Sequence, residues 1–132
     1  MIVVDTNVIA YLFLPGTYTK NSEALLRAYP LWVAPYLWRS EFRNILATYV
    51  RAKQLRESIA QSIYLAAENL LRGKEYSVNG DRVLQIAFAT KLSGYDCEFI
   101  ALAERLNCSL VSSDKKLLKA SDGRGKNLLD YN

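Results

Sequence analysis

The chain opens with a short β-branched run, Ile2–Val4, that is apolar at every position and is followed at once by an acid, Asp5. A strand without polar alternation must be buried on both faces, which is typical of a central strand in a parallel sheet. Helices then have to cover both faces of that sheet. The opening run therefore indicates an α/β fold with Asp5 at the carboxyl end of a buried strand.

The rest of the chain alternates further strands with helices. We expect strands at 31–34, 75–78 and 109–112, and an edge strand at 127–129. We expect helices over 21–29, 36–53, 56–71, 79–92, 95–107 and a short stretch after 113, and a first helix that Thr6 or Asn7 can cap and that ends near Phe13. This order predicts one three-layer α/β/α domain over residues 1–132, with a central, mainly parallel sheet.

Composition excludes several classes of protein. Of the 132 residues, 51 % are hydrophobic and 23 % are charged, as in a globular domain, and the longest apolar stretch, 8–14, is too short to cross a bilayer. The first residues lack the features of a secretory signal, so we expect a cytoplasmic protein without a membrane partner. Cys97 and Cys108 have no histidine to complete a zinc site, and we expect both to be buried free thiols.

The chain carries 17 Lys and Arg against 13 Asp and Glu, a net charge of +4 that favours a polyanionic partner without proving one. Arg39 and Arg43 flank Glu41 in the sequence. Five more basic residues follow Asp114 within a short span: Lys115, Lys116, Lys119, Arg124 and Lys126. We expect basic residues to surround an acidic pocket.

Four acids stand where strands end or helices begin, or beside a core-facing helix stripe: Asp5, Glu41, Asp96 and Asp114. In open α/β sheets, ligands bind beyond the carboxyl ends of the strands, so these side chains can meet at one edge. Carboxylates held close together repel one another unless a cation neutralises them, and hard oxygen ligands suit Mg²⁺ or Mn²⁺. The pattern therefore predicts a metal site that activates water for phosphodiester hydrolysis.

Each acid also has a purely structural interpretation. Asp5 can simply cap the following helix, Glu41 can be a solvated surface charge, and Asp96 and Asp114 can be first-turn acids that interact with the helix dipole. Taken singly, none of them indicates a site. Their joint placement carries the hypothesis.

Four segments resemble PIN-domain ribonucleases, and most closely the VapC-type toxins of toxin–antitoxin pairs. They are the opening 2–7 (Ile-Val-Val-Asp-Thr-Asn), 38–44 around Glu41, 95–103 around Asp96 and 110–118 around Asp114. The resemblance covers essentially the whole chain and implies a PIN-like fold. It also implies Mg²⁺- or Mn²⁺-dependent endonucleolytic cleavage of single-stranded or looped RNA such as tRNA or rRNA.

The same resemblance assigns Asp5, Glu41, Asp96 and Asp114 to the metal-binding catalytic site. It implies that Ser112 orients the site by hydrogen bonding and that Asn7 assists, although Asn7 is equally well explained as a helix cap. Some relatives carry a further acid after the fourth one, where this chain has Lys115 and Lys116, which weakens the case for a second bound metal.

The implied partners are a second copy in a homodimer and a cognate antitoxin whose tail enters the active-site groove. Three aromatic residues, Trp32, Tyr36 and Trp38, can line such a groove, but core packing is the more frequent role for each. We therefore expect all three to be buried.

The sequence argues against two other classes of function and leaves a third open. An aspartate-nucleophile phosphatase needs a second Asp two residues after the first, where this chain has Asn7. A phosphoacceptor signalling domain needs an acidic pair after the first strand and an acceptor Asp after a middle strand, yet Val78 leads into Asn79 and Gly80. A PIN-like RNA- or protein-binding domain with little or no turnover stays open.

Overall fold

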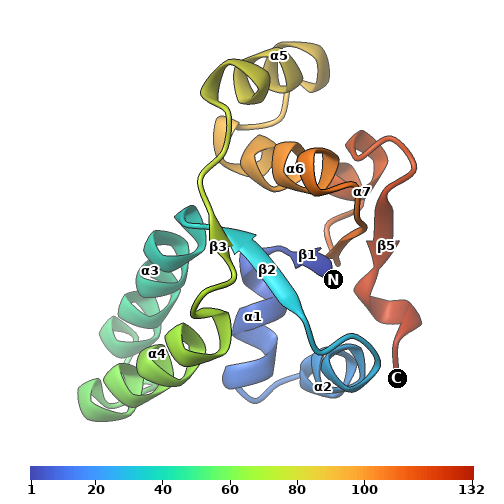
Figure 1. The fold of residues 1–132 in the computed structure, drawn as a ribbon. Coiled ribbons are helices and arrows are strands. Elements are labelled where there is room, and N and C mark those ends of the chain that lie inside the picture. Colours follow the sequence, from blue (N-terminus) through green and yellow to red (C-terminus); the bar gives the residue numbers. More distant parts are fainter.

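The computed structural model describes residues 1–132 and places five strands in one sheet of order β3-β2-β1-β4-β5 (Figure 1). The strands are β1 (Ile2–Val4), β2 (Trp32–Pro35), β3 (Glu75–Tyr76), β4 (Leu110–Ser112) and β5 (Gly125–Asn127). Every neighbouring pair is parallel. The all-apolar β1 lies in the centre, as its sequence predicts.

Helices cover both faces of this sheet. They are α1 (Thr6–Phe13), α2 (Thr19–Ala28), α3 (Leu37–Arg51), α4 (Glu57–Leu71), α5 (Gly80–Thr90), α6 (Gly94–Leu106), α7 (Lys115–Ala120) and the 3₁₀ turn η1 (Leu128–Asp130). Because successive side chains of a strand alternate in direction, Ile2 and Val4 join one buried cluster with α1–α4 while Val3 joins another with α5–α7. The predicted three-layer α/β/α architecture is confirmed.

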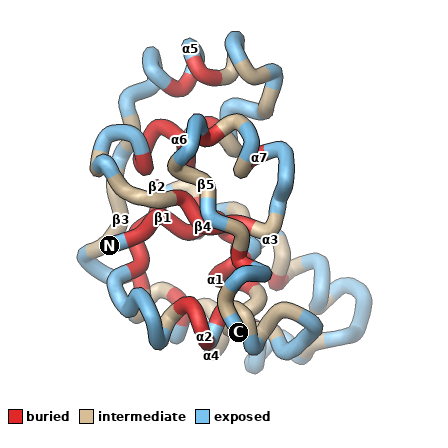
Figure 2. The backbone as a smooth tube through the Cα atoms, turned by 90° about the vertical axis from the view of Figure 1, so that its right-hand side faces the viewer, coloured by how far each residue is buried: buried red, intermediate tan, exposed pale blue.

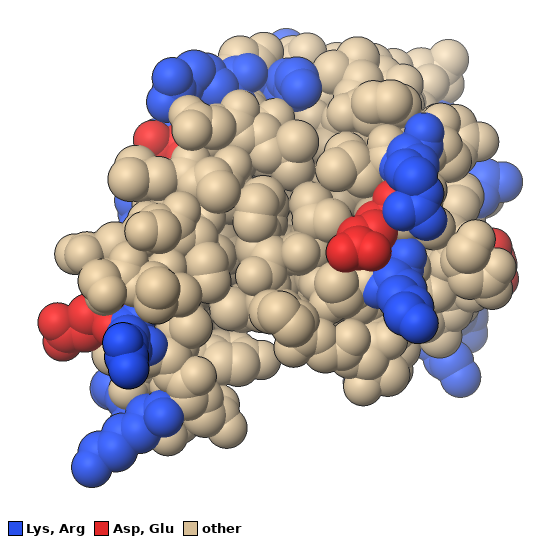
Figure 3. Space-filling view, turned by 90° about the horizontal axis from the view of Figure 1, so that it is seen from below, with Lys and Arg blue, Asp and Glu red and all other residues tan.

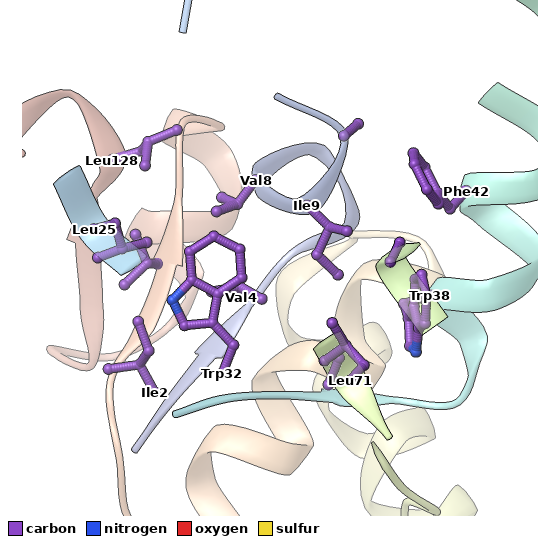
Figure 4. Packing of buried hydrophobic residues seen from close by; sticks show 14 of the residues in the cluster. Ile2, Val4, Val8, Ile9, Leu25, Trp32, Trp38, Phe42, Leu71 and Leu128 are labelled. Carbon is purple, nitrogen blue, oxygen red and sulfur yellow. The ribbon is translucent and has the colours of Figure 1, made fainter. Parts of the chain in front are cut away.

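The buried residues lie mainly in β1, β2 and β4 and in parts of α1 and α6, whereas β3 and β5 are only partly buried (Figure 2). Trp32 is fully buried among Val8, Leu25 and Leu128, and Trp38 packs near Phe42 (Figure 4). The expected burial of both tryptophans is thus confirmed. It was wrong for Tyr36, which is 54 % exposed because it lies beyond the carboxyl end of β2, outside the sheet. The Arg39 guanidinium lies over one face of its ring.

The edges of the sheet differ from expectation. The last strand is Gly125–Asn127 instead of 127–129, because the Asn127 side chain accepts a hydrogen bond from the Leu129 N–H and starts a 3₁₀ turn. β3 ends at Tyr76 instead of residue 78, because its partner β2 ends at Pro35 and the chain turns into α3. α1 is capped by Asp5, not by Thr6 or Asn7.

Cys97 is buried and Cys108 is half-buried, and both are free thiols. None of the helices combines the length and the hydrophobicity that crossing a bilayer requires.

We predict that Gly125→Ala destabilises the sheet edge next to β4. A Cβ atom at this position would lie 2.8 Å from the Leu118 carbonyl oxygen and 3.0 Å from its Cα, so α7 would have to shift. We expect a loss of about 1–3 kcal/mol in the free energy of unfolding, measured by urea denaturation. Gly80→Ala is the control, because nothing lies within 4 Å of a Cβ there. Equal midpoints for the two variants would contradict the prediction.

Candidate active site

Asp5 lies at the carboxyl end of β1 and is 7 % exposed. Its Oδ1 accepts a hydrogen bond of 3.0 Å from the Val8 N–H, which starts α1. Its Oδ2 accepts a hydrogen bond from the Ser112 hydroxyl at the end of the neighbouring strand β4. Because parallel strands end at the same edge, this bond crosses between the ends of the two central strands.

Ser112 is fully buried, and its hydroxyl oxygen also accepts the Asp114 N–H at 2.9 Å. It thereby joins the end of β1 to the segment that begins α7. The hydrogen bonding that was predicted for Ser112 from the family resemblance is present. Its contribution to function stays a prediction.

Glu41 reaches the same edge from α3. The Thr6 hydroxyl donates to Glu41 Oε1 at 2.6 Å, directly after Asp5 in the chain. The sequence suggested Thr6 only as a possible cap of the first helix, not as a partner of an acid. Its position between Asp5 and Asn7 in a motif segment was the signal that could have assigned it this role.

A second polar group holds α3 against the edge of the sheet. Glu75 of β3 accepts the Trp38 Nε1–H at 2.7 Å and two N–H groups of Arg39 at 2.6 Å each. Arg39 also lies 3.4 Å from Glu68 of α4. These contacts fix the turn of α3 that carries Glu41. They also place the Arg39 guanidinium in ion pairs with Glu75 and Glu68.

Asp96 and Asp114 stand at the starts of α6 and α7. Asp96 is half-buried in the first turn of α6, where its N–H donates to the Ser93 cap at 3.1 Å. Asp114 is exposed and caps α7, its Oδ1 accepting N–H bonds from Lys116 at 2.9 Å and Leu117 at 3.4 Å. Asp114 is therefore the cap residue of α7 and not a first-turn acid, and both bonds end on its Oδ1.

Three of the four acids share one pocket of about 210 Å³. Asp5, Glu41 and Asp96 line it, together with Asn7 at its exposed side. Asp114 is not part of the wall. Its charge nevertheless acts on Asp5 and on Asp96, so it lies close beside the pocket.

Burial and mutual repulsion disfavour the charged forms of these acids. Burial, followed by the charges of Asp114 and Glu41, raises the pKa of Asp5 to about 6 against the opposing hydrogen bonds from Ser112 and Val8. The pKa of Glu41 is raised by burial and then by Asp96, and that of Asp96 by burial and then by Asp114. A bound cation would reverse this cost.

Glu98 is a fifth acid near the site, and nothing in the sequence pattern singled it out. Its pKa is raised first by burial and then by the charge of Glu41. The sequence placed Glu98 two residues after Asp96, but only the packing of α6 near α3 brings it close to Glu41. It adds to the negative potential of the pocket.

The carboxylate oxygens of this pocket are suitable ligands for a divalent cation, but they are not yet arranged around one metal position. As the side chains stand, no three acidic or thiol groups are close enough together to hold a metal ion. Asp5 and Glu41 instead direct oxygens to Ser112 and Thr6, and like-charged carboxylates repel. A shared metal such as Mg²⁺, which takes few protein ligands, therefore requires Asp96 and Asp114 to rotate toward the held side chains of Asp5 and Glu41.

Comparisons with known proteins agree on the fold. The family model described as PIN domain matches residues 2–123. No curated protein matches the sequence significantly. PAE2754 from Pyrobaculum aerophilum has a similar structure, with 19 % identity, a TM-score of 0.78 and coverage of 98 % of this chain and 84 % of that one.

Two further solved structures are similar in the same way. FitAcB from Neisseria gonorrhoeae shows 17 % identity and a TM-score of 0.74, covering 98 % of this chain and 99 % of that one. FitAB bound to the IR36 DNA fragment shows 19 % identity and a TM-score of 0.76, covering 97 % and 95 %. At these identities the three structures establish the shared fold.

We predict that Asp5 makes the metal-free protein less stable as the pH rises. Its folded pKa, about 6, exceeds the ordinary value of 3.8, so the folded state binds the proton more tightly. This stabilisation is complete at a pH below the ordinary pKa of 3.8. It is lost as the pH rises through the folded-state pKa of about 6. At about 1.4 kcal/mol per pKa unit it amounts to on the order of 3 kcal/mol.

Urea denaturation in EDTA at about pH 4 and about pH 7 tests this, with Asp5→Asn as the comparison. Asn keeps the cap and a partner for Ser112 but does not titrate. The free energy of unfolding of Asp5→Asn should fall less between the two pH values than that of the wild type. Parallel pH profiles would refute the prediction.

Proposed function

The chain belongs to the PIN-domain family, and from that membership and the pocket geometry we propose that it is a Mg²⁺- or Mn²⁺-dependent endoribonuclease, the toxin of a toxin–antitoxin pair. PIN domains are generally nucleases, and PIN nucleases typically use divalent metals. The observation that carries the proposal is the single pocket that collects Asp5, Glu41 and Asp96, with Asp114 beside it.

Asp5, Glu41, Asp96 and Asp114 would hold the metal. A divalent ion there supplies activation of a water molecule and neutralises charge on the phosphate. The protein's own groups prepare the site: Ser112 and Val8 fix the orientation of the Asp5 carboxylate, and Thr6 fixes that of Glu41.

We take the substrate to be single-stranded or looped RNA, such as a loop of tRNA or rRNA. The acids line a recess, and an unpaired strand can bend its backbone toward such a recess where a duplex cannot. One structure with this fold is a complex with a DNA fragment, so a DNA oligonucleotide of matching sequence belongs in the assay.

The alternative is a PIN-like binding domain with little turnover. Nucleic-acid binding is served by basic groups, whereas a cluster of carboxylates repels phosphates. Keeping Asp5 buried also lowers stability near neutral pH, a cost that a binding surface does not require. Both arguments favour catalysis.

We further propose that the protein acts in the cytoplasm and forms a homodimer through α5. We also propose that it binds an antitoxin between α3 and α4. On α5, Leu84 and Phe88 lie one turn apart and are 53 % and 77 % exposed, as an apolar face for a second copy would be. Between α3 and α4, a mostly apolar hollow of about 530 Å³ includes Leu46, Tyr64 and Leu65 and fits an apolar segment of an antitoxin.

We predict that Asp96→Asn lowers Mg²⁺-dependent cleavage of a tRNA or rRNA loop more than about 100-fold. Removing a group that only supports a metal ligand costs about 10- to 100-fold, and Asp96 is proposed to bind the metal itself. Asp81→Asn is the matched control, because Asp81 is also a first-turn acid of a helix and lies outside the pocket. Cleaved ends are read on a sequencing gel with and without EDTA. Undiminished cutting by Asp96→Asn, or in EDTA, would overturn the nuclease assignment.

We also predict that Phe88→Glu converts the dimer to monomer, because a charge then replaces the most exposed apolar side chain of α5. Molar mass from light scattering measures the change. Leu65→Glu on α4 is the reciprocal control and should leave the dimer intact. A wild-type protein that is already monomeric at micromolar concentration would exclude this interface.

A further inference from the structure

The basic residues fall into two groups that differ in their partners. All the ion pairs in the structure are formed by arginine, namely Arg39 with Glu68 and Glu75, and Arg82 with Glu104. Arg124, which was expected near the pocket, donates to Asn107 instead. The lysines form no ion pair, so, like the arginines outside these pairs, they are available to an external anion.

Three of these lysines lie around one hollow. Lys91 at the end of α5 and Lys116 and Lys119 of α7 line a space of about 540 Å³ in whose wall no carboxylate takes part. On the end of the molecule opposite α5, by contrast, acidic side chains lie directly beside basic ones (Figure 3). The three lysines of the hollow thus have no acid in its wall to compensate their charge.

The hollow adjoins the acidic pocket through two chain segments. The Lys116 N–H donates to the Asp114 carboxylate, while the Lys116 side chain lines the hollow. On the other side, the chain runs from Lys91 to the Ser93 cap and into the first turn of α6, which holds Asp96. An RNA strand with one phosphate at Asp96 and Asp114 therefore has its neighbouring phosphates close to these lysines.

An exposed aromatic ring stands in the same segment. Tyr95 directly precedes Asp96 and is 65 % exposed, although aromatic side chains normally bury themselves. Proteins that bind single strands combine a basic groove along the backbone with aromatic rings on which bases stack. The lysine hollow and Tyr95 supply both elements next to the acids.

We propose that Lys91, Lys116, Lys119 and Tyr95 form a subsite for single-stranded RNA beside the bond that is cut. The three ammonium groups bind backbone phosphates, and the Tyr95 ring stacks on a base. The subsite rests on the proposed function, because the substrate brings RNA to this edge of the protein. It sets the path of the strand and leaves the chemistry to the acids.

The test measures binding without cleavage. A fluorescent oligouridylate of about 12 nucleotides is titrated with protein in EDTA at several KCl concentrations, and anisotropy gives Kd. The variant Lys91→Ala/Lys116→Ala/Lys119→Ala is compared with Lys20→Ala/Lys53→Ala/Lys74→Ala. Both lose the same charge, and Lys53 shares the left-handed backbone of Lys91, with φ of 59° against 62°.

We expect the subsite variant to bind about tenfold or more weakly and to lose about 2 from the slope of log Kd against log salt, since each single-strand phosphate contact contributes about 0.7. The remote triple variant should keep most of the wild-type slope. Tyr95→Ala should weaken binding about fivefold or more with an unchanged slope, and Tyr95→Phe should restore it.

Equal slopes for the two triple variants would overturn the subsite, and so would undiminished binding by both Tyr95 variants. A cleavage assay with Mg²⁺ separates this failure from failure of the nuclease. Cleavage with equal slopes refutes the subsite alone, whereas lysine-dependent binding without cleavage supports the subsite and refutes the nuclease. An acidic peptide that binds the lysines in place of RNA would also count against the subsite.

Discussion

The burial of one carboxylate links the fold of this protein to its proposed chemistry. Asp5 caps α1 through Val8, joins the ends of β1 and β4 through Ser112 and lines the pocket. An Asp in this position is a structural part of the central strand pair and at the same time an acid whose charge is disfavoured. The structural and catalytic interpretations of Asp5 therefore do not exclude each other, since the bonds that stabilise the fold also orient the acid.

The strand order explains why acids so distant in sequence meet. From β1 the chain proceeds to β2 and β3 on one side, and β4 and β5 lie on the other, so the order reverses between β1 and β4. Such a reversal leaves a crevice at the carboxyl ends of the strands. Glu41 enters it from the helix that follows β2, Asp96 from the helix that precedes β4, and Asp114 from the turn that follows β4.

How far the sequence predicts the structure depends on burial. β1 and β4 were predictable because apolar runs buried on both faces have few alternatives, and the acids after them followed from that placement. The edges were not, because β3 and β5 end where a neighbouring segment stops or caps them, which only tertiary contacts determine. The closeness of Glu98 to Glu41 and the exposure of Tyr36 depend likewise on how helices pack beyond the sheet.

The distribution of charge across the two neighbouring sites has a physical logic. A carboxylate pocket repels phosphates, so a substrate strand approaches only if positive charge nearby offsets that repulsion. Arginines held by Glu68, Glu75 and Glu104 cannot provide it, whereas lysines without ion pairs can. Because a flexible ammonium group binds a phosphate as a point charge without fixed geometry, lysine suits a strand of varying sequence. Catalytic precision is then required only where Ser112 and Thr6 hold the acids.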